Sequence, residues 1–455
     1  MSVITVDALL TALPEGVVVT DPATCENYRH DWSRDPGAGT PLAVVRPTDA
    51  DQVQTVVRWC AENRVPITPR GAGTSLSGGS SAVAGGIVMS LERMRAIEID
   101  ITTRVAVVEP GAFNAEVKAA AAAHGLWYPP DPSSYEICSI GGNIATNAGG
   151  LCCVKYGVTT DYVLGLDVVL ADGEKITLGG KRIKDVAGLS LLKLFVGSEG
   201  TLGIITRAIL RLVPAQPPRA TLVAAFADPE AAARAVVELG LVARPSMVEL
   251  MDNASINIVE DALTMGLDRT AGALLLIQSD APGAACSAEI QLAEAACTKH
   301  GASECFSTDD ADEGEMFVVA RRAFFPALEG RGALLLEDVG APVPQLPALL
   351  AGVAAISAKH GVAIPVVAHA GDGNTHPTIV FDPTNTAARD RAAVAFTEIM
   401  ELALSLGGTI TGEHGVGRLK KELLPTQLGP RVTQLTREVK QLFDPSNILN
   451  PGAIL

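Results

Sequence analysis

The sequence lacks the cysteine spacing of a disulfide framework. Eight cysteines are present, and none of them forms a CxxC pair; they stand at positions 25, 60, 138, 152, 153, 286, 297 and 305. We therefore expect reduced thiols. The sequence also lacks the basic start of a secretory signal peptide, because its first Lys or Arg is Arg29. Both absences predict a cytoplasmic protein.

Long apolar runs that could form a membrane span are missing as well. Two uncharged stretches, residues 137–154 and 339–358, are long enough to be tested. The first contains four glycines and two asparagines, and the second contains Pro342, Pro344 and Pro347. Such residues are poorly suited to a spanning helix, so we expect no transmembrane segment. Peripheral association with the inner face of a membrane stays open.

Positive charge is scarce. The 35 Lys and Arg residues stand against 51 Asp and Glu residues, which gives a formal net charge of −16. A field of this sign repels nucleic acids and anionic membrane surfaces, so we expect no nucleic-acid partner. Any anionic substrate must then be attracted by local cations or a metal. The length of 455 residues predicts two or three domains, and the hydrophobic content of 48% is typical of a globular protein.

The hydrophobic pattern predicts a mixed α and β organisation. Residues 42–45 and 65–68 read as strands on either side of a helix over 50–62, and a third strand covers 86–90. Hairpins are predicted across 97–108 and 166–178, and a helix over 114–124. A stiff linker, Pro214-Ala215-Gln216-Pro217-Pro218, then separates a second region, which begins with a strand over 220–226 and a helix over 229–239.

Two glycine-rich loops lack the signatures of common nucleotide sites. In the loop over residues 69–79, Leu76 stands where the dinucleotide motif needs its third glycine. Gly79 stands where a P-loop needs lysine. This disfavours NAD or ATP sites of those kinds. The second loop, residues 138–150, offers many backbone N–H groups beside small side chains.

Both loops are also free of acid. Residues 63–91 and 137–160 contain no Asp or Glu, although an even spread of the 51 acids would place about three in each window. Carboxylates would repel a bound pyrophosphate. The two loops together therefore predict an anionic nucleotide cofactor in the first region.

A histidine pair lies in the second region. His369 and His376 flank a glycine-rich turn that joins two predicted strands, and Glu413 and His414 follow further on. Two imidazoles and a carboxylate are a familiar ligand set for a catalytic divalent metal, and the remaining imidazole could move a proton. Asp372 is interpreted as a turn former. We expect Glu413 to close a strand over 408–411, with Gly412 and Gly415 bending the chain so that Glu413 and His414 serve one pocket.

Several segments, in this order, resemble those of a known flavoprotein family. They are residues 69–79, 130–134, 138–150, 155–157, 197–203, 369–376, 413–417, 443–445 and 449–451. They look like the FAD-binding and active-site segments of the vanillyl-alcohol oxidase superfamily, and within it of the FAD-linked D-2-hydroxy acid dehydrogenases of the D-lactate dehydrogenase and glycolate oxidase type. The resemblance runs over nearly the whole chain.

The resemblance implies non-covalent FAD, since the first loop has no histidine and Cys138 looks like a packing residue. The residues that it implies for the cofactor are Pro69, Arg70, Gly71, Ala72, Gly73, Thr74, Ser75, Gly78, Pro130, Asp131, Ser134, Ser139, Gly141, Gly142, Asn143, Ala145, Asn147, Ala148, Gly149, Tyr156, Gly157, Glu199, Gly203, Ile204, Ile205 and Asn450.

The resemblance also assigns roles at the substrate side. His369, His376 and Glu413 match the ligands of a divalent metal, Zn or Mn, and His414 matches the catalytic base. Arg321 matches the arginine that binds the substrate carboxylate, and Asn374 belongs to the same substrate site. Relatives acting on D-2-hydroxyglutarate carry a further lysine where this chain has Leu336, followed by Glu337 and Asp338. This favours a monocarboxylate such as D-lactate or glycolate.

The implied fold is α+β, with a two-subdomain FAD-binding domain of the vanillyl-alcohol oxidase type and an α+β substrate domain with an antiparallel sheet. The predicted ranges are 1–213 for the FAD domain, 214–420 for the substrate (cap) domain, and 421–455 for a segment packing back on the FAD domain. The expected reaction oxidises a small D-2-hydroxy acid to the 2-oxo acid, with hydride transfer to flavin N5.

Two alternatives remain open: a flavoenzyme for a larger 2-hydroxy acid such as D-2-hydroxyglutarate, and a non-catalytic FAD-binding subunit of an oxidase complex. The electron acceptor, whether a quinone, a cytochrome or an electron-transfer protein, is left open, as is a homodimer.

Overall fold

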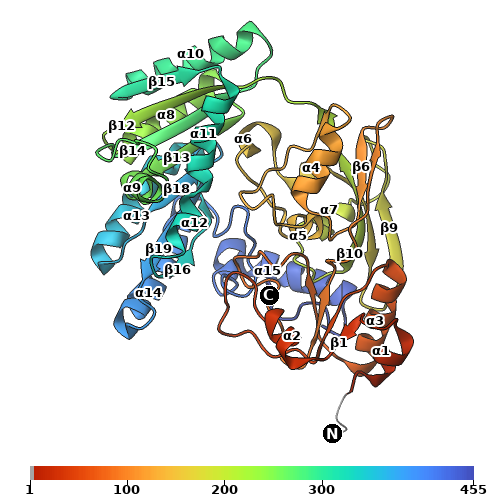
Figure 1. Cartoon of the computed structure of the whole chain (residues 1–455). Coiled ribbons are helices and arrows are strands. Elements are labelled where there is room, and N and C mark those ends of the chain that lie inside the picture. Colours follow the sequence, from red (N-terminus) through yellow and green to blue (C-terminus); the bar gives the residue numbers. More distant parts are fainter. Residues whose placement is uncertain (1–4) are drawn as a thin grey trace. The chain divides into compact units, whose positions relative to one another are not determined.

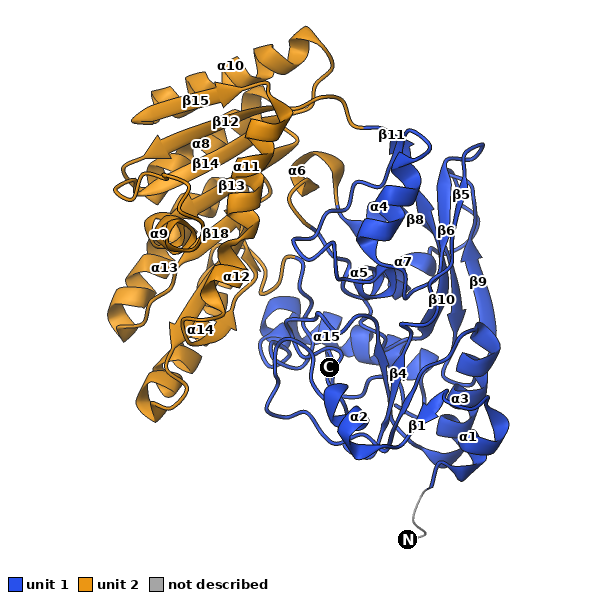
Figure 2. Ribbon diagram, viewed as in Figure 1, with its two compact units in different colours: residues 1–149, 158–215, 413–455 blue, residues 150–157, 216–412 orange. Residues whose placement is uncertain are grey.

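The structure, a computed structural model, describes residues 5–455 and divides into two compact units (Figure 2). Unit 1 comprises the chain up to residue 149 together with 158–215 and 413–455. Unit 2 comprises 150–157 and 216–412. The first four residues of the predicted FAD domain lie outside the described part. The units differ from the predicted ranges in that 150–157 belongs with unit 2, and 214–215 and 413–420 belong with unit 1.

One sheet of unit 1 contains the predicted strand–helix–strand element. Strands β2 (Ala43–Val45) and β3 (Ile67–Arg70) both run parallel to β4 (Ile87–Ser90), which lies between them, and the short β1 (Val18–Val19) pairs antiparallel with β2. The two predicted strands are therefore not neighbours. Helix α3 (Ala50–Asn63) makes the crossover.

Local sequence explains where α3 begins and ends. The Asp49 carboxylate accepts hydrogen bonds from the backbone N–H groups of residues 51 and 52, which satisfies donors at the helix start. Arg64 ends the helix in the left-handed conformation. The face of α3 that bears Val53, Val56 and Cys60 is fully buried in the core beneath the sheet.

A second, antiparallel sheet of unit 1 has the strand order β5-β6-β10-β8-β9. The two predicted hairpins are confirmed as β5–β6 and β8–β9. The strands are β5 (Ile97–Asp100), β6 (Val105–Val108), β8 (Val163–Val169), β9 (Lys175–Gly179) and β10 (Ile204–Arg211), and β7 (Leu126–Trp127) pairs with β11 (Val213–Pro214). The helices of the unit are α1 (Asp7–Ala12), α2 (Pro22–Asn27), α4 (Asn114–Ala122), α5 (Ile140–Thr146), α7 (Leu192–Phe195) and α15 (Leu424–Phe443), with a 3-10 turn η1 (Thr159–Asp161).

Unit 2 is built on a mainly antiparallel sheet in the order β15-β12-β14-β13-β18-β19-β16, and β17 also pairs with β19 (Figure 1). Its strands are β12 (Ala220–Phe226), β13 (Met247–Asp252), β14 (Ala273–Ser279), β15 (Glu304–Thr308), β16 (Ala333–Leu336), β17 (Val339–Gly340), β18 (Val366–His369) and β19 (Asn374–Phe381). The hairpin predicted around His369 and His376 is confirmed as β18–β19. The antiparallel sheet agrees with the expected substrate domain.

Helices cover both faces of this sheet. On β12, Ala225 packs with Ala320 and Phe324, which belong to the helices of one face. Side chains alternate along a strand, so Leu222 and Ala224 point to the other face, and they are fully buried too. The helices are α6 (Cys153–Tyr156), α8 (Pro229–Val242), α9 (Asn253–Leu263), α10 (Ala284–Lys299), α11 (Ala311–Arg322), α12 (Phe324–Leu328), α13 (Leu346–His360) and α14 (Thr386–Ser405), with a 3-10 turn η2 (Val343–Gln345).

Two local expectations need correction. The strand predicted over 408–411 is wrong: in this segment only Thr409 forms a bridge, to Gly340. The alternating small and β-branched residues look like a strand, but Gly408 crosses directly over the Gly340 carbonyl, where a Cβ would lie 2.0 Å from the oxygen. The second glycine-rich loop is partly helical, since α5 occupies residues 140–146. No helix within residues 5–455 combines the length and apolar character needed to cross a membrane.

Candidate functional site

The first glycine-rich loop leaves β3 at Arg70, the last residue of that strand. The Arg70 guanidinium donates a hydrogen bond to the His30 carbonyl at 3.0 Å, and burial lowers the pKa of Arg70 from its ordinary value. Gly73 has a φ of +77°, and a Cβ there would lie 2.1 Å from Arg70 Nη2. The positive φ therefore favours glycine at this position, and a Cβ would displace the Arg70 guanidinium.

The two acid-free loops meet at Ser139. The Ser139 hydroxyl accepts a hydrogen bond from the Ala72 N–H at 3.1 Å, and it caps α5 by accepting from the Gly142 N–H at 3.4 Å. A Cβ on Gly71 would lie 2.3 Å from Ser139 Oγ. The loops thus form one surface of small residues and backbone groups, as a ligand that approaches the backbone closely would need.

A buried amide network supports the second loop. Asn114 Nδ2 donates to Asn143 Oδ1 at 3.1 Å and lies 3.3 Å from the Pro130 carbonyl. Asn143 also contacts the Cys138 thiol, whose pKa is raised by burial. A buried thiol of this kind remains protonated and is a poor nucleophile. This environment supports the expectation that Cys138 packs and does not anchor the flavin.

Glu199 joins three of the predicted cofactor segments. Its carboxylate accepts hydrogen bonds from the N–H groups of Val416 at 2.7 Å and Gly417 at 2.8 Å, and its carbonyl accepts from Asn450 Nδ2 at 2.8 Å. Burial raises the pKa of Glu199 to about 7. The same Asn450 amide donates to the Gly79 carbonyl at 2.7 Å, so the first loop is held in the same network.

The bend after Glu413 differs from the expectation. Gly415 has a φ of +87°, and a Cβ there would lie 2.8 Å from Glu199 Oε1. Gly412 is not in the left-handed region; a Cβ at Gly412 would instead lie 2.3 Å from Asn374 Oδ1. Gly415 therefore supplies the turn, and Gly412 allows the Asn374 side chain to lie close to the backbone.

The remaining predicted cofactor residues fall into two groups. Those in unit 1 lie on the two glycine-rich loops, on the segment 130–134 or at the start of β10, and they are Pro69, Thr74, Ser75, Gly78, Asp131, Ser134, Gly141, Ala145, Asn147, Ala148, Gly149, Gly203, Ile204 and Ile205. Tyr156 and Gly157 belong to unit 2. The Tyr156 hydroxyl and the Lys155 ammonium both bind the buried carboxylate of Asp280 there.

The histidine pair lies in the interior of unit 2. The rings of His369 and His376 are nearly perpendicular, with centroids 5.1 Å apart, and both side chains are buried. His369 Nδ1 lies 2.7 Å from Glu249 Oε1. Because a carboxylate only accepts, Nδ1 carries the proton in this hydrogen bond, and Glu249 fixes the orientation of the ring.

Glu249 also holds the predicted substrate arginine. Its Oε2 lies 2.9 Å from Arg321 Nε, and both side chains are about 1% exposed. Glu249 thus fixes the orientation of an imidazole and a guanidinium together. The sequence reasoning missed Glu249, although a single acid within the apolar strand Met247-Val248-Glu249-Leu250-Met251 was a usable signal.

Asp338 is a second buried carboxylate, which the sequence suggested only as an acidic neighbour of Leu336. Its Oδ1 accepts from Asn374 Nδ2 at 2.9 Å and lies 3.8 Å from His376 Nδ1. Its Oδ2 accepts from the Thr411 hydroxyl at 2.6 Å and from the Gly412 N–H at 3.0 Å. Asp338 therefore holds the chain immediately before Glu413.

Glu413 and His414 belong to unit 1, directly after the last residue of unit 2. Their side chains lie 3.6 Å apart and are partly exposed. The His414 carbonyl accepts a hydrogen bond from Ser77 Oγ at 3.2 Å, so the pair is tied to the first glycine-rich loop. An imidazole with some access to solvent beside a carboxylate can accept a proton.

Comparisons with known proteins define the family. Residues 41–179 match the model of the FAD binding domain, and residues 215–454 match that of the FAD linked oxidases, C-terminal domain. The chain is 42% identical over 416 residues to the glycolate oxidase subunit GlcD of Bacillus subtilis (strain 168), covering 90% of this chain and 88% of the relative. It is 35% identical over 426 residues to a D-lactate dehydrogenase of Archaeoglobus fulgidus, covering 92% and 93%.

Solved structures agree on the fold. The structure of p-cresol methylhydroxylase with substrate bound matches with a TM-score of 0.83 and 19% identity, covering 98% of this chain and 95% of that one. An alkyldihydroxyacetonephosphate synthase matches with a TM-score of 0.75 and 18% identity, covering 98% and 84%. The chain belongs to the FAD-linked oxidase family, with the predicted flavoprotein fold of the vanillyl-alcohol oxidase type. It is an FAD-binding oxidoreductase.

Proposed function

We propose that the protein oxidises a small D-2-hydroxy acid, of the D-lactate or glycolate type, to the 2-oxo acid. The observation that carries this proposal is the buried array of unit 2, in which Glu249 orients both His369 and Arg321. An enzyme for 2-hydroxy acids needs a cation for the carboxylate and groups that act on the adjacent hydroxyl. The names of the relatives, glycolate oxidase subunit and D-lactate dehydrogenase, support the same substrate class.

The residues of unit 1 fit FAD. The glycines at 71 and 73 leave no room for a Cβ, and the loops carry no acid that would repel a pyrophosphate. Bound FAD would supply the acceptor for a hydride from the substrate carbon. We assign the predicted cofactor residues of unit 1 to its binding; the further assignment of Tyr156 and Gly157 remains a proposal of the same kind.

The donor set also fits a divalent metal such as Zn²⁺ or Mn²⁺. We assign His369, His376 and Glu413 as the metal ligands. Asp338, whose Oδ1 lies 3.8 Å from His376 Nδ1, either orients His376 or serves as a further ligand. Imidazole nitrogens with carboxylate oxygens suit these ions, and the Glu249 carboxylate on His369 is the usual outer partner of a ligating histidine. Such an ion would act as a Lewis acid toward the substrate hydroxyl.

The chain's own residues then divide the work. Arg321 binds the substrate carboxylate, because a guanidinium held by Glu249 presents its donors in a fixed direction. Asn374, held by Asp338, contributes an amide beside the histidines. His414 accepts the hydroxyl proton at a ring nitrogen. Two buried acids, Glu337 and Asp338, disfavour a second substrate carboxylate near the β16 end, which favours a monocarboxylate over D-2-hydroxyglutarate.

Anaerobic flavin reduction tests the proposal. The purified holoenzyme is mixed with D-lactate, glycolate, L-lactate or D-2-hydroxyglutarate, and flavin absorbance is followed before and after exhaustive chelation. We expect D-lactate or glycolate to bleach the flavin fastest, and chelation followed by Zn²⁺ or Mn²⁺ to remove and restore the rate. A chain that holds FAD but is bleached by no 2-hydroxy acid would instead be a non-catalytic subunit.

The acceptor of the flavin electrons, whether a quinone, a cytochrome or an electron-transfer protein, belongs to the same proposal. So does the cytoplasmic location, with peripheral attachment at the inner face of the membrane, and so does a homodimer. Reoxidation of the reduced flavin by a soluble quinone analogue, compared with oxygen and cytochrome c, distinguishes the acceptors.

A further inference from the structure

A segment of unit 1 exposes apolar side chains along its whole length. Residues 181–191, between β9 and α7, are exposed at every position and contain no helix or strand. Within it the side chains of Ile183, Val186 and Leu189 are 63%, 89% and 88% exposed. Leu191 and Leu194 extend the set at 38% and 40%. We call residues 181–194 the apolar loop.

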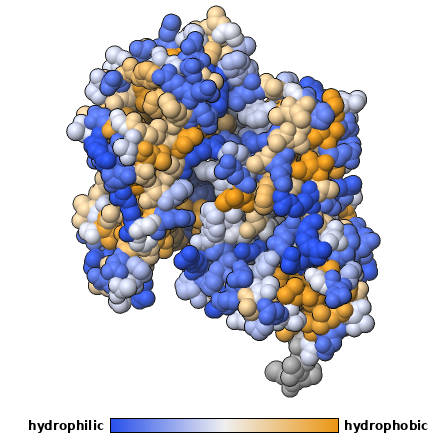
Figure 3. Space-filling model, viewed as in Figure 1, coloured by the Kyte–Doolittle hydropathy of each residue, from blue (hydrophilic) through white to orange (hydrophobic). Residues whose placement is uncertain are grey.

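This concentration is unusual for a surface in contact with water alone. Single exposed apolar residues are ordinary, but several within one segment mark a place that becomes covered. On the face of unit 1 seen in Figure 3, apolar residues reach the surface in patches bordered by hydrophilic ones. Transfer of exposed Val, Leu and Ile side chains out of water is favourable, so an apolar environment would bind this loop.

The charge of the loop identifies that environment. The apolar loop carries Lys181, Arg182, Lys184 and Lys193 against a single acid, Asp185, in a chain whose net charge is −16. Asp185 pairs with Arg182, and Asp100 pairs with Lys181 at 2.9 Å. Lys184 forms no ion pair with any described residue, and a positive excess therefore remains beside the exposed Val186.

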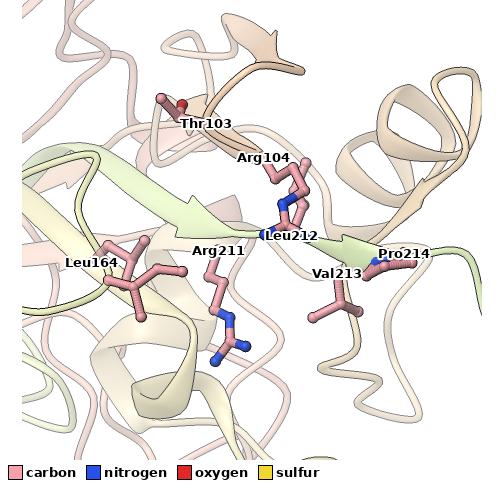
Figure 4. A pocket seen from close by; sticks show the side chains of 8 residues that line it. Thr103, Arg104, Leu164, Arg211, Leu212, Val213 and Pro214 are labelled. Atoms are coloured by element: carbon pink, nitrogen blue, oxygen red, sulfur yellow. The ribbon is translucent and has the colours of Figure 1, made fainter.

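A pocket at the base of the loop adds two more cations. Ile183 lines it together with Arg104, from the β5–β6 turn, and Arg211, from the end of β10 (Figure 4). Both arginines are exposed, and within residues 5–455 neither forms an ion pair. Guanidinium groups are suited to bidentate recognition of phosphate. The exposed Ile183 of the apolar loop thus lies next to a place where an anionic group can be held.

We propose that the apolar loop is the part of the chain that attaches the protein to an anionic lipid surface, an inference that rests on the peripheral attachment proposed above and assigns it to this segment. Its apolar side chains insert at the level of the headgroups, and Arg104, Arg211 and Lys184 bind lipid phosphates. Basic residues interleaved with exposed Ile, Val and Leu are the combination that binds such surfaces. A second copy of this acidic chain is a poorer match for the positive loop, and an irregular, fully exposed segment offers no preformed face for a protein partner.

Vesicle co-sedimentation of the full-length holoenzyme tests this proposal. We expect binding to phosphatidylcholine vesicles that contain phosphatidylglycerol, weaker binding at high salt, and little binding to phosphatidylcholine alone. The double variant V186S/L189S should bind at least about tenfold more weakly, since two apolar side chains are lost. The variant R104Q/K184Q should bind about 30-fold more weakly, since each basic residue contributes about fivefold.

Matched variants elsewhere in unit 1 control for general surface effects. L442S replaces a leucine that is 77% exposed, and R64Q replaces an exposed arginine whose backbone φ of 55° matches the 54° of Arg104. Both should bind vesicles as the unchanged protein does. FAD content and Tm confirm that each variant is folded.

Two results would overturn the inference. Equal affinity of the unchanged protein for anionic and neutral vesicles is one, and undiminished binding by both loop variants is the other. A loop variant that loses self-association in solution, with vesicle binding unchanged, would show that a second copy covers the loop. The flavin-reduction rate in solution is a separate readout, so failure here leaves the proposed reaction untouched.

Discussion

Glu249 and His369 are direct partners across the antiparallel strands β13 and β18, and their side chains meet at 2.7 Å in the interior of unit 2. The opposite oxygen of the same carboxylate reaches Arg321. Glu249 therefore acts through two other side chains, as a positioning residue, and its replacement should disturb the proposed metal ligand His369 and the proposed carboxylate-binding Arg321 together.

Glu249→Gln should lower metal affinity and raise KM for the substrate, by about 10- to 100-fold each, because the uncharged amide neither strengthens the His369 imidazole as a ligand nor neutralises Arg321. Removing the negative charge that faces the buried guanidinium should also destabilise the unit by about 3–5 kcal/mol. Metal titration of the chelated protein, steady-state kinetics and thermal unfolding measure the three effects.

Glu260→Gln is the control for Glu249→Gln. Glu260 is a buried carboxylate of the same unit that accepts hydrogen bonds only from backbone N–H groups at residues 265–267 in the described contacts. The Glu260→Gln substitution should lower Tm and leave metal affinity and KM unchanged. A similar loss of metal affinity in both variants would reduce Glu249 to a structural role.

His414→Gln should lower kcat by about 10²- to 10⁴-fold with little change in KM, because it removes the proposed proton acceptor and keeps a side chain of similar size. The rate of anaerobic flavin reduction measures this directly. His300→Gln is the control, since His300 pairs with Glu238 at the surface of unit 2, at 2.7 Å. If flavin reduction in His414→Gln matched that of the control, His414 would not be the base.

Gly73→Ala should abolish or strongly weaken FAD binding. The added Cβ would collide with the Arg70 guanidinium, and the left-handed backbone at this residue costs a non-glycine residue about 1 kcal/mol or more. The ratio of flavin to protein absorbance and a FAD titration of the stripped protein report the loss. Gly85→Ala shares the positive φ, at +68°, but has nothing within 4 Å of its Cβ, so it should keep its flavin.

The raised pKa of Glu199 predicts that the stability of the protein depends on pH. Its folded pKa of about 7 lies above the ordinary value, because burial outweighs the two hydrogen bonds from Val416 and Gly417. The folded state then binds more protons than the unfolded state between about pH 4.5 and pH 7, so this group's contribution to stability falls as the pH rises through that window. The loss amounts to about 3 kcal/mol.

Unfolding midpoints of the unchanged protein and of Glu199→Gln, measured between about pH 5 and pH 8, isolate that contribution. The neutral amide of the variant resembles the protonated carboxyl, so the stability of the unchanged protein relative to the variant should be highest at the acid end and should fall toward pH 8, where the buried carboxyl ionises. Parallel pH curves would contradict the raised pKa.

The elements that the sequence predicted well are those whose information is local. Hairpins β5–β6 and β8–β9 and helix α3 follow from turn residues, caps and a single amphipathic face. The strand prediction for residues 408–411 failed because the conformation of this segment is set by the distant Gly340 carbonyl. No alternation along that segment could reveal such a contact.

The candidate site shows the same division. Histidines 369 and 376 were predicted because they flank one turn, whereas Glu249 lies 120 residues before His369 and meets it only through the register of β13 on β18. Asp338 was noticed as an acid but not as the residue that holds Asn374 and Gly412. Strand register is a tertiary property, and a single sequence does not display it.

The buried Asp280 has a consequence for how the protein can be dissected. Its carboxylate binds Lys155 and Tyr156, which come from the middle of the flavin-domain sequence, as well as Gln216 at the start of the second region. A fragment that begins at residue 216 would lack residues 150–157. The buried carboxylate of Asp280 would then lose Lys155 and Tyr156 as partners. Neither unit is a contiguous stretch of sequence: unit 2 needs residues 150–157, which lie within the sequence of unit 1, and unit 1 needs residues 413–455, which follow unit 2.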